Sequence, residues 1–263
     1  MTRKPRVGIA LSGGAARCIA HIGVLEVLES EGINIDLIAG TSGGAFVGAL
    51  FASGVSLLEL EELAFKLSWR GMVKPYFSRQ GLIPNKNLLK YVTKKIGHID
   101  FKNLKIPLAV VAADLRSGEK VILTEGPVAE AVAASCSLPV VFSPHHQHGK
   151  ILVDGGIASN LPVQTLVENM GATMTIAVDV NDRARAFSKL NNIFQIGIHT
   201  VSLFAKKNAA VEKRLADVVI NVDANGISLL DLKKAHLMIK RGRTAAEKVI
   251  PIIKKILAED LHI

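Results

Sequence analysis

The stretch IDLIAGTSGG, residues 35–44, joins a short apolar run to a cluster of small residues around one hydroxyl. The run IDLIA predicts a buried strand, and the residues from Gly43 to Ala52 predict a helix. Between them, Gly40, Ser42 and Gly44 match G-x-S-x-G, the pattern of a serine on a sharp strand-to-helix turn. Side chains two residues away from such a serine would collide, so both glycines fit a nucleophile elbow. A serine that only caps the helix explains these five residues equally well when they are taken alone.

A second strand-to-helix turn lies earlier in the chain, in the segment LSGGAARCIAHIGVL. Gly13 and Gly14 leave backbone N–H groups exposed at the start of a helix predicted from Ala15 to Glu31. The predicted strands 5–11 and 35–39 are expected to be neighbours, so that their turns converge at the carboxyl edge of one sheet. One turn then brings a hydroxyl and the other brings N–H donors, which acyl transfer needs for its developing oxyanion. A phosphate-binding turn is the weaker alternative, because G-x-G-x-x-G and the Walker lysine are both missing.

A third element is the segment DGGIASNLPV, residues 154–163. Asp154 ends a predicted strand, and Gly155 and Gly156 allow its turn to approach another backbone closely. An Asp-Gly turn is common in loops and carries no chemistry by itself. In combination with the other two elements, Asp154 becomes the natural base for Ser42.

Strand and helix patterns alternate along the rest of the chain, without a repeat or a linker. Further strands are predicted at residues 108–114, 120–125, 151–154, 173–180 and 217–223, and further helices at 56–67, 85–96, 128–138 and 161–170. This alternation predicts an α/β fold of three layers, with a mostly parallel central sheet flanked by helices. We expect a single domain over residues 1–263, with a motif-bearing core at about 5–180 and a mainly helical part at about 187–263. The less regular segment 68–87 is a candidate cover over the site.

The composition narrows the class of protein. Of the 263 residues, 49% are hydrophobic, which excludes a disordered chain and fits a sheet that is buried on both faces. The formal net charge is +9, and the excess is concentrated in the segments KKIGHIDFKNLK, KKNAAVEKR and KKAHLMIKRGR. Such surfaces attract anionic lipid, acidic metabolites or nucleic acid. No nucleic-acid motif accompanies them, and ordinary solvated helix faces explain them as well.

Metal sites and disulfides are not expected. Cys18 and Cys136 lack metal-ligand spacing and give no disulfide framework, so no cofactor is predicted and a reducing compartment is the default. His145, His146 and His148 suggest a metal cluster, but no second set of ligands accompanies them and a loop cluster is the preferred interpretation. No apolar stretch is long enough to span a bilayer. The expected location is the cytoplasm, with peripheral contact at the inner face of the membrane as an addition.

The three motifs together resemble the patatin-like phospholipases, which include bacterial single-domain members and the catalytic domain of neuropathy target esterase. The resemblance covers about residues 5–180, with the motifs in the order and spacing of that family. It implies a serine esterase or lipid acyl hydrolase, of phospholipase A or lysophospholipase type, that acts through an acyl-enzyme without a catalytic histidine. Ser42 would be the nucleophile and Asp154 the general base of a Ser–Asp dyad.

The same resemblance implies the residues around the dyad. The implied oxyanion donors are the N–H groups of Gly13, Gly14, Ala15 and Gly43. The implied supporting residues are Arg17, Asn160 and Pro162, besides Gly40 and Gly44 in the elbow and Gly155 and Gly156 after the aspartate. Two positions depart from the family pattern, because Ala15 replaces the third glycine and Cys18 replaces the glycine after the basic residue. An alanine still donates its N–H group provided that its φ remains negative.

Two other functions stay open on the sequence. An α/β-hydrolase needs a histidine after the acid, and His199 and His236 both follow Asp154, although each lies in a stretch predicted to be helical. The other is a non-catalytic lipid- or nucleotide-binding module that regulates a partner. The expected substrate is a phospholipid or another fatty acyl ester, and no nucleic-acid partner is expected.

Overall fold

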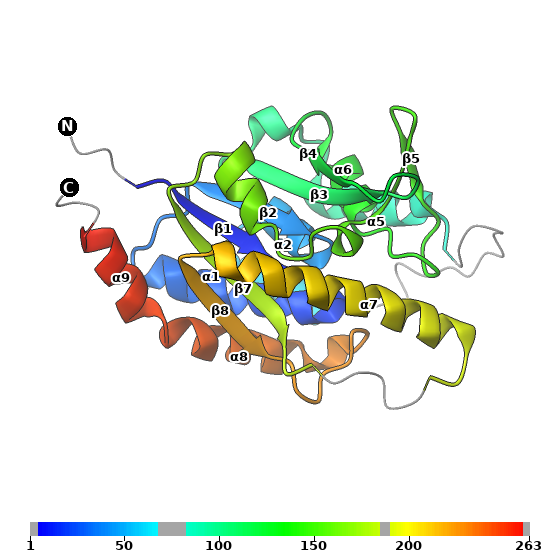
Figure 1. The fold of residues 1–263 in the computed structure, drawn as a ribbon. Helices are drawn as coiled ribbons and strands as arrows, with labels where there is room; N and C mark the ends of the chain where they lie inside the picture. The colour runs from blue at the N-terminus through cyan, green and yellow to red at the C-terminus, as the bar shows by residue number, and fades with distance from the viewer. Residues whose placement is uncertain (1–4, 68–82, 185–189, 260–263) are drawn as a thin grey trace.

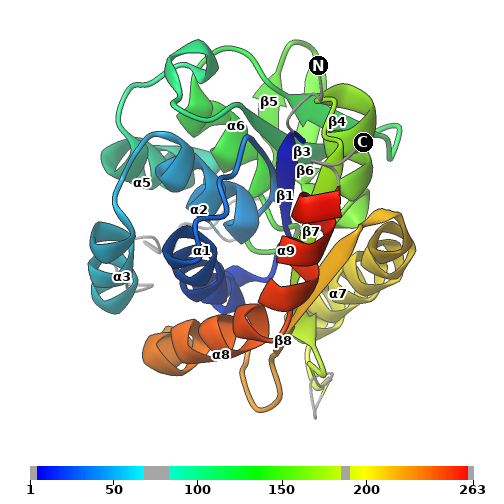
Figure 2. The same ribbon diagram turned by 90° about the vertical axis from the view of Figure 1, so that its left-hand side faces the viewer.

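The structure is a computed structural model and describes residues 5–67, 83–184 and 190–259. A sheet of eight strands runs through the middle, and helices cover both of its faces (Figure 1 and Figure 2). The strands are β1 (Val7–Leu11), β2 (Leu37–Thr41), β3 (Leu108–Asp114), β4 (Lys120–Leu123), β5 (His145–Gln147), β6 (Lys150–Asp154), β7 (Met174–Asp182) and β8 (Val218–Asp223). The helices are α1 (Ala20–Ser30), α2 (Gly43–Ala52), α3 (Leu57–Lys66), α5 (Asn85–Ile96), α6 (Val128–Ser135), α7 (Ile193–Glu212), α8 (Ala235–Glu247) and α9 (Ile250–Glu259).

The sheet is mostly parallel, as the sequence predicts. Its strands lie in the order β5-β6-β3-β2-β1-β7-β8, and the five strands β3, β2, β1, β7 and β8 run parallel to one another. The exceptions lie at one side, where β6 and β4 pair antiparallel with β3, and β5 pairs antiparallel with β6. Strands β1 and β2 are neighbours, so the turns that follow them meet at the same edge.

The two faces of the parallel strands differ in the size of their side chains. Towards α1, α2 and α8 the strands turn large residues such as Ile9 and Ile38 into the main core. On the opposite face, four neighbouring strands present alanine side chains. Ala177, Ala10, Ala39 and Ala109 lie in register on four adjacent strands, and we call them the alanine row. This row leaves room for Leu166 and for Ala209 of α7 to pack closely against the sheet.

Several local expectations need correction. The helix predicted from residue 15 opens with a 3₁₀ helix, Ala15–Ile19, before α1 begins. The helix predicted over 161–170 is reduced mainly to a π-helical turn, Thr165–Asn169. Of the three histidines predicted to lie in a loop, His145 and His146 instead lie in β5, which pairs with β6, whereas His148 lies in the turn between the two strands. Most of the candidate cover at 68–87 lies outside the described residues, and its last three residues begin α5.

Candidate active site

Ser42 occupies a strained turn between β2 and α2. Its backbone has a φ of 53° and a ψ of −125°, a conformation that side-chain-bearing residues rarely adopt. The Ser42 N–H group donates to Ser135 Oγ at 2.7 Å, and the Ser135 hydroxyl in turn donates to the carbonyl of Val111 at 2.5 Å. Helix α6 and strand β3 therefore hold the turn in its unfavourable conformation.

Glycine is required on both sides of Ser42, as the elbow pattern predicts. A Cβ atom on Gly40 would lie 2.7 Å from the Cα atom of Ala45, which is backbone and cannot move aside. A Cβ atom on Gly44 would clash with the carbonyl oxygen of Leu11 at the end of β1. The same contact shows how closely the elbow helix approaches the neighbouring strand.

The Ser42 hydroxyl donates directly to the carboxylate of Asp154, with 2.6 Å between Ser42 Oγ and Asp154 Oδ2. The other carboxylate oxygen accepts the N–H group of Gly156 at 2.8 Å. This contact depends on the antiparallel direction of β6, which meets β3 at Ala112, one residue beyond the last residue that β3 pairs with β2. Strand β6 therefore ends with Asp154 at the height of Ser42, which follows β2, and only β3 lies between the two strands.

Asp154 is almost fully buried, with 5% of its surface exposed. Burial raises the pKa of its carboxyl from the ordinary value of 3.8 to about 6, although the hydrogen bonds from Ser42 and Gly156 act in the opposite direction. A Cβ atom on the next residue, Gly155, would clash with the carbonyl of Val111, so glycine is needed for this close approach. The result is a carboxylate that is ionised at neutral pH but more basic than an exposed aspartate.

The glycine loop after β1 is held by two asparagines. The Gly13 N–H group donates to the carbonyl of Asn160 at 3.0 Å, so it is already used and is not free for an oxyanion, in contrast to the expectation from sequence. The Gly13 carbonyl accepts the side-chain amide of Asn181 at 2.7 Å and that of Asn160 at 3.4 Å. In a trans peptide the C=O and N–H groups point in opposite directions, so the N–H group of Gly14 points away from both asparagines.

Ala15 and Cys18, which depart from the family pattern, adopt unexpected roles. The φ of Ala15 is 49°, not negative, so this residue occupies a conformation that favours glycine. Cys18 is buried, and burial raises the pKa of its thiol. A Cβ atom on Gly43 would lie 2.6 Å from Cys18 Sγ and 3.2 Å from the carbonyl of Ala15. The two turns are therefore in direct contact, and Cys18 fills the space between them.

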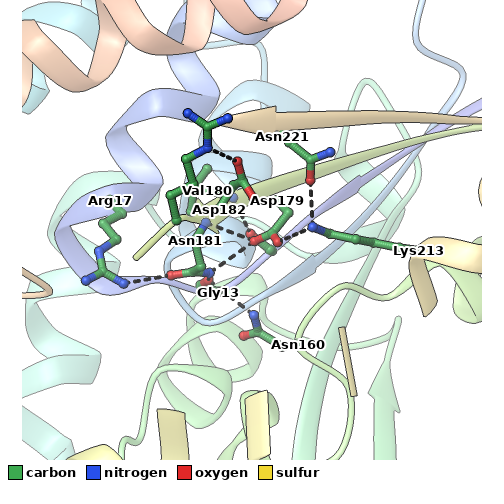
Figure 3. A network of polar contacts seen from close by, with 11 residues as sticks. Gly13, Arg17, Asn160, Asp179, Val180, Asn181, Asp182, Lys213 and Asn221 are labelled. Atoms are coloured by element: carbon green, nitrogen blue, oxygen red, sulfur yellow. Dashed lines mark hydrogen bonds and ion pairs between the residues drawn. The ribbon is translucent and has the colours of Figure 1, made fainter. Parts of the chain in front are cut away.

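A network of polar contacts extends from the glycine loop to β8 (Figure 3). Arg17 donates to Asn181 Oδ1 at 3.1 Å, and two of its other nitrogens donate to a single carbonyl, that of Ile227. Asp179 accepts the backbone N–H group of Asn181 at 2.9 Å and forms an ion pair with Lys213 at 2.6 Å. Sequence reasoning named Arg17 but missed the residues at the end of β7, where a polar D-V-N follows an apolar run.

A cavity of about 770 Å³ opens over the dyad. Ser42 and Asp154 lie in its wall together with Gly14 and Ala15. Much of the remaining wall is apolar, contributed by Phe46, Leu88, Val92, Leu138, Val141 and Phe142. A largely apolar cavity with a few convergent polar groups suits a ligand with a hydrocarbon chain.

The histidines do not complete a triad in this arrangement. His199 lies on α7 and lines the same cavity, but the Ser42 hydroxyl already donates to the carboxylate. His236 stacks on Phe65, with 3.8 Å between the ring centroids, and does not line the cavity.

Among the residues that the structure describes, no group of three or more His, Cys, Asp or Glu side chains could hold a metal ion. In the same part of the chain, no helix is long and apolar enough to cross a membrane.

Comparison with known proteins gives a consistent result. Residues 9–167 match the family model described as patatin-like phospholipase. The chain is 38% identical over 180 residues to an NTE family protein of Mycobacterium tuberculosis, a match covering 67% of this chain and 49% of that protein. It is 31% identical over 180 residues to the lysophospholipase NTE1 of Yarrowia lipolytica, covering 66% of this chain and 12% of that protein. The chain thus matches about half, or less, of the length of these relatives.

Two solved structures share the fold. One is VipD from Legionella pneumophila, with a TM-score of 0.54 and 14% identity over 95% of this chain and 67% of VipD. The other is ExoU from Pseudomonas aeruginosa, solved in complex with SpcU, with a TM-score of 0.51 and 16% identity over 95% of this chain and 53% of ExoU. At this level of identity the likeness supports the three-layer architecture alone.

Proposed function

This chain belongs to the patatin-like phospholipase family, and on that premise we propose that it hydrolyses fatty acyl esters of lipids through a Ser42–Asp154 dyad. The observation that carries the proposal is the 2.6 Å hydrogen bond from the Ser42 hydroxyl to a buried carboxylate in the wall of an apolar cavity. The name of the fungal relative, a lysophospholipase, supports a lysophospholipase or phospholipase A among the ester hydrolases.

In the first half of the reaction, Ser42 Oγ attacks the carbonyl carbon of the ester while its proton passes to Asp154 Oδ2. The tetrahedral intermediate then collapses, the carbon–oxygen bond to the alcohol breaks, and Asp154 returns the proton to the leaving oxygen. In the second half, water attacks the acyl carbonyl carbon while Asp154 takes its proton. The bond between this carbon and Ser42 Oγ then breaks, Asp154 returns the proton to Ser42 Oγ, and the fatty acid is released. The raised pKa of Asp154 favours both proton transfers at neutral pH.

The oxyanion donors in this proposal are the N–H groups of Gly14, Ala15 and Gly43. Gly43 is the first residue of α2, and the first N–H groups of a helix have no partner within it. The helix dipole adds a partial positive charge at the same place. Gly13 is left out, because its N–H group donates to Asn160.

Two alternatives make different predictions. A Ser–Asp–His triad requires His199 to move between Ser42 and Asp154, so the His199→Gln variant would lose activity as severely as Ser42→Ala. A lipid-binding module without catalysis predicts no covalent reaction at Ser42. The direct contact between hydroxyl and carboxylate favours the dyad over both.

The test is covalent labelling with a fluorophosphonate, together with turnover of a short soluble ester. We expect wild type to be labelled and active, and Ser42→Ala and Asp154→Asn to lose roughly 10⁴-fold or more in turnover. The control is Ser202→Ala, a cavity serine whose hydroxyl donates to the carbonyl of Ile198 at 2.9 Å. Full turnover in Ser42→Ala would rule out the assignment.

We also propose that the protein acts at the surface of membranes that contain anionic lipid, with the inner face of the cytoplasmic membrane as the site. The support is the net charge of +9, which attracts such a surface over roughly the Debye length of about 10 Å at 0.1 M salt. No cofactor takes part in the proposed reaction.

A further inference from the structure

The segment that contains helix α7 exposes many apolar side chains, although one of them, Leu203, also lines the cavity. In the described part of the chain fifteen large hydrophobic side chains are exposed, and eight of them lie between residues 190 and 215. They are Leu190, Ile193, Phe194, Ile196, Leu203, Phe204, Val211 and Leu215, with exposed fractions from 44% to 75%. Single exposed hydrophobic residues are ordinary, but a group that shares one face of a helix marks an interaction surface.

The helical spacing places three of these side chains on one side of α7. Ile196, Phe204 and Val211 recur at intervals of seven or eight residues, which places them on one face of a helix. Lys207 on α7 and Arg214, in the 3₁₀ helix Lys213–Leu215 that follows it, are both exposed. We call this set of five residues the outer face of α7.

Acidic residues are missing from the exposed surface of this segment. Between residues 190 and 215 the sequence has one acidic residue, Glu212. It is buried, where it accepts hydrogen bonds from Ser159 and from the backbone of Gln164. The exposed surface is therefore apolar and cationic, the combination found in helices that lie in a membrane interface.

The opposite side of α7 is part of the proposed active site. Ile198 and Ser202 line the cavity over the dyad. The side chain of Asn208 donates to the carbonyl of Gly156 at 2.9 Å and accepts the N–H group of Asn160 at 2.8 Å. These bonds fix the helix relative to the turn that follows Asp154. In Figure 1 α7 crosses in front of the sheet and extends beyond the strands at the right.

From this arrangement we infer that the outer face of α7 is the surface by which the protein docks on a bilayer containing anionic lipids. Ile196, Phe204 and Val211 enter the boundary between head groups and acyl chains, while Lys207 and Arg214 contact anionic head groups. The inference rests on the proposed function, since it brings the acyl-binding cavity, lined by the other side of the same helix, next to the lipid.

A second copy of the chain is the competing occupant of this face. In a symmetric dimer the same patch meets itself, so both copies bring cationic side chains and no exposed acidic side chain from this segment to the interface. Two cationic surfaces oppose association, whereas an anionic surface attracts the same side chains. Charge therefore favours the lipid surface.

The test measures binding of the full chain to vesicles of phosphatidylcholine with and without phosphatidylglycerol. The first variant is Ile196→Ser/Phe204→Ser, whose side chains do not line the cavity. Its control is Leu58→Ser/Ile252→Ser, two residues exposed by 75% and 52% on α3 and α9. We expect the first variant to bind mixed vesicles roughly tenfold more weakly or worse, because it lacks two apolar side chains that would be buried in the bilayer. The control should bind like wild type.

The second pair of variants tests the charge. Lys207→Gln/Arg214→Gln should lose roughly tenfold or more in binding to mixed vesicles at low salt, whereas the exposed pair Lys240→Gln/Lys248→Gln on and after α8 should lose less. Equal losses in a test variant and its control, or wild-type binding in Ile196→Ser/Phe204→Ser, would overturn the inference. So would a wild-type dimer that Ile196→Ser/Phe204→Ser converts to a monomer in sedimentation while vesicles are not bound.

Turnover of a short soluble ester separates this inference from the proposed function. If α7 docks the protein, the two α7 variants keep wild-type turnover in solution and lose it only on vesicles. If wild type binds vesicles through α7 but neither hydrolyses esters nor reacts with a fluorophosphonate, docking stands and the proposed function fails. If the soluble ester is hydrolysed but vesicle binding does not depend on α7, the hydrolase stands and docking fails.

Discussion

The chemistry of Asp154 is decided by its burial. Its pKa of about 6 lies above the ordinary value because the carboxylate is withdrawn from water, and only the ionised form can take the Ser42 proton. We therefore expect kcat/KM for a soluble ester to rise as pH increases through about 6 and then to level off. An activity that is independent of pH from 4 to 8 in folded protein, checked by circular dichroism, would contradict this role for Asp154.

Asn181 is a positioning residue in this scheme. Its amide holds the Gly13 carbonyl at 2.7 Å and so sets the direction of the Gly14 N–H group. We expect Asn181→Ala to lower kcat by roughly 10- to 100-fold with little change in KM, somewhat less than the loss of a whole oxyanion donor.

Two further variants separate this effect from general destabilisation. Asn181→Asp keeps the acceptor for Arg17 but cannot donate to Gly13, so it should be as damaging as alanine. Asn221→Ala removes only the distant contact of Lys213 and should retain wild-type kcat. If Asn181→Asp were fully active, the direction of the Gly14 N–H group would have to be set by other contacts.

At the scale of elements, the alanine row sets the distance between the sheet and α7. We expect Ala39→Leu to lower the free energy of unfolding by about 1–3 kcal/mol, because the extra atoms overpack this face. Activity should fall as well, since the displaced layer holds the turn after Asp154 through Asn208. The control is Ile38→Val on the opposite face, which should cost about 0.5–1.5 kcal/mol and keep its activity. Urea unfolding measures the stability of the two variants, and ester turnover measures their activity. An Ala39→Leu variant as stable as wild type would argue against tight packing between the alanine row and α7.

The sequence allows most elements to be predicted, but not all. Strands β1, β2, β3, β7 and β8 are apolar runs between turn signals, which can be recognised without tertiary information. Strand β5 has the sequence HHQ and no apolar pattern. Its pairing with β6 depends on a turn with positive φ at His148 and Gly149, and His-Gly is not among the usual signals for such a turn.

The residues of the candidate site also divide into those that the sequence predicts and those that it does not. Ser42 and Asp154 can be predicted because their neighbours must be glycine for reasons of space. The roles of Asn181 and Ala15 cannot, because each depends on a contact or a torsion that only the folded chain defines. The large exposed face of α7 is hidden in the sequence for a related reason, since the helix has apolar residues on its inner side as well.

At the scale of the whole molecule, Asp154 reduces stability. Because its folded pKa is raised, the folded protein binds a proton more tightly than the unfolded chain between pH 4 and 6, so stability falls as pH rises through this range. We expect Asp154→Asn to be more stable than wild type at pH 8, by roughly 2–3 kcal/mol, and to lose this advantage below about pH 4. Urea unfolding at pH 4, 6 and 8 measures the difference, with Glu119→Gln, an exposed carboxylate, as the control. A less stable Asp154→Asn at pH 8 would contradict the prediction.

The position of β3 between the strands of Ser42 and Asp154 also has a consequence for the newly made protein. The two residues are 112 positions apart and meet only through the pairing of β2 and β6 with β3. At translation rates of roughly 5–20 residues per second, the nucleophile leaves the ribosome at least about 5 s before its base. Lys213 and Asn208, which fasten the loops around the dyad, follow later still. A nascent chain that has not yet reached Asp154 therefore carries a serine without its proposed base, and the proposed hydrolysis can begin only after Asp154 and the residues that hold its turn have been made.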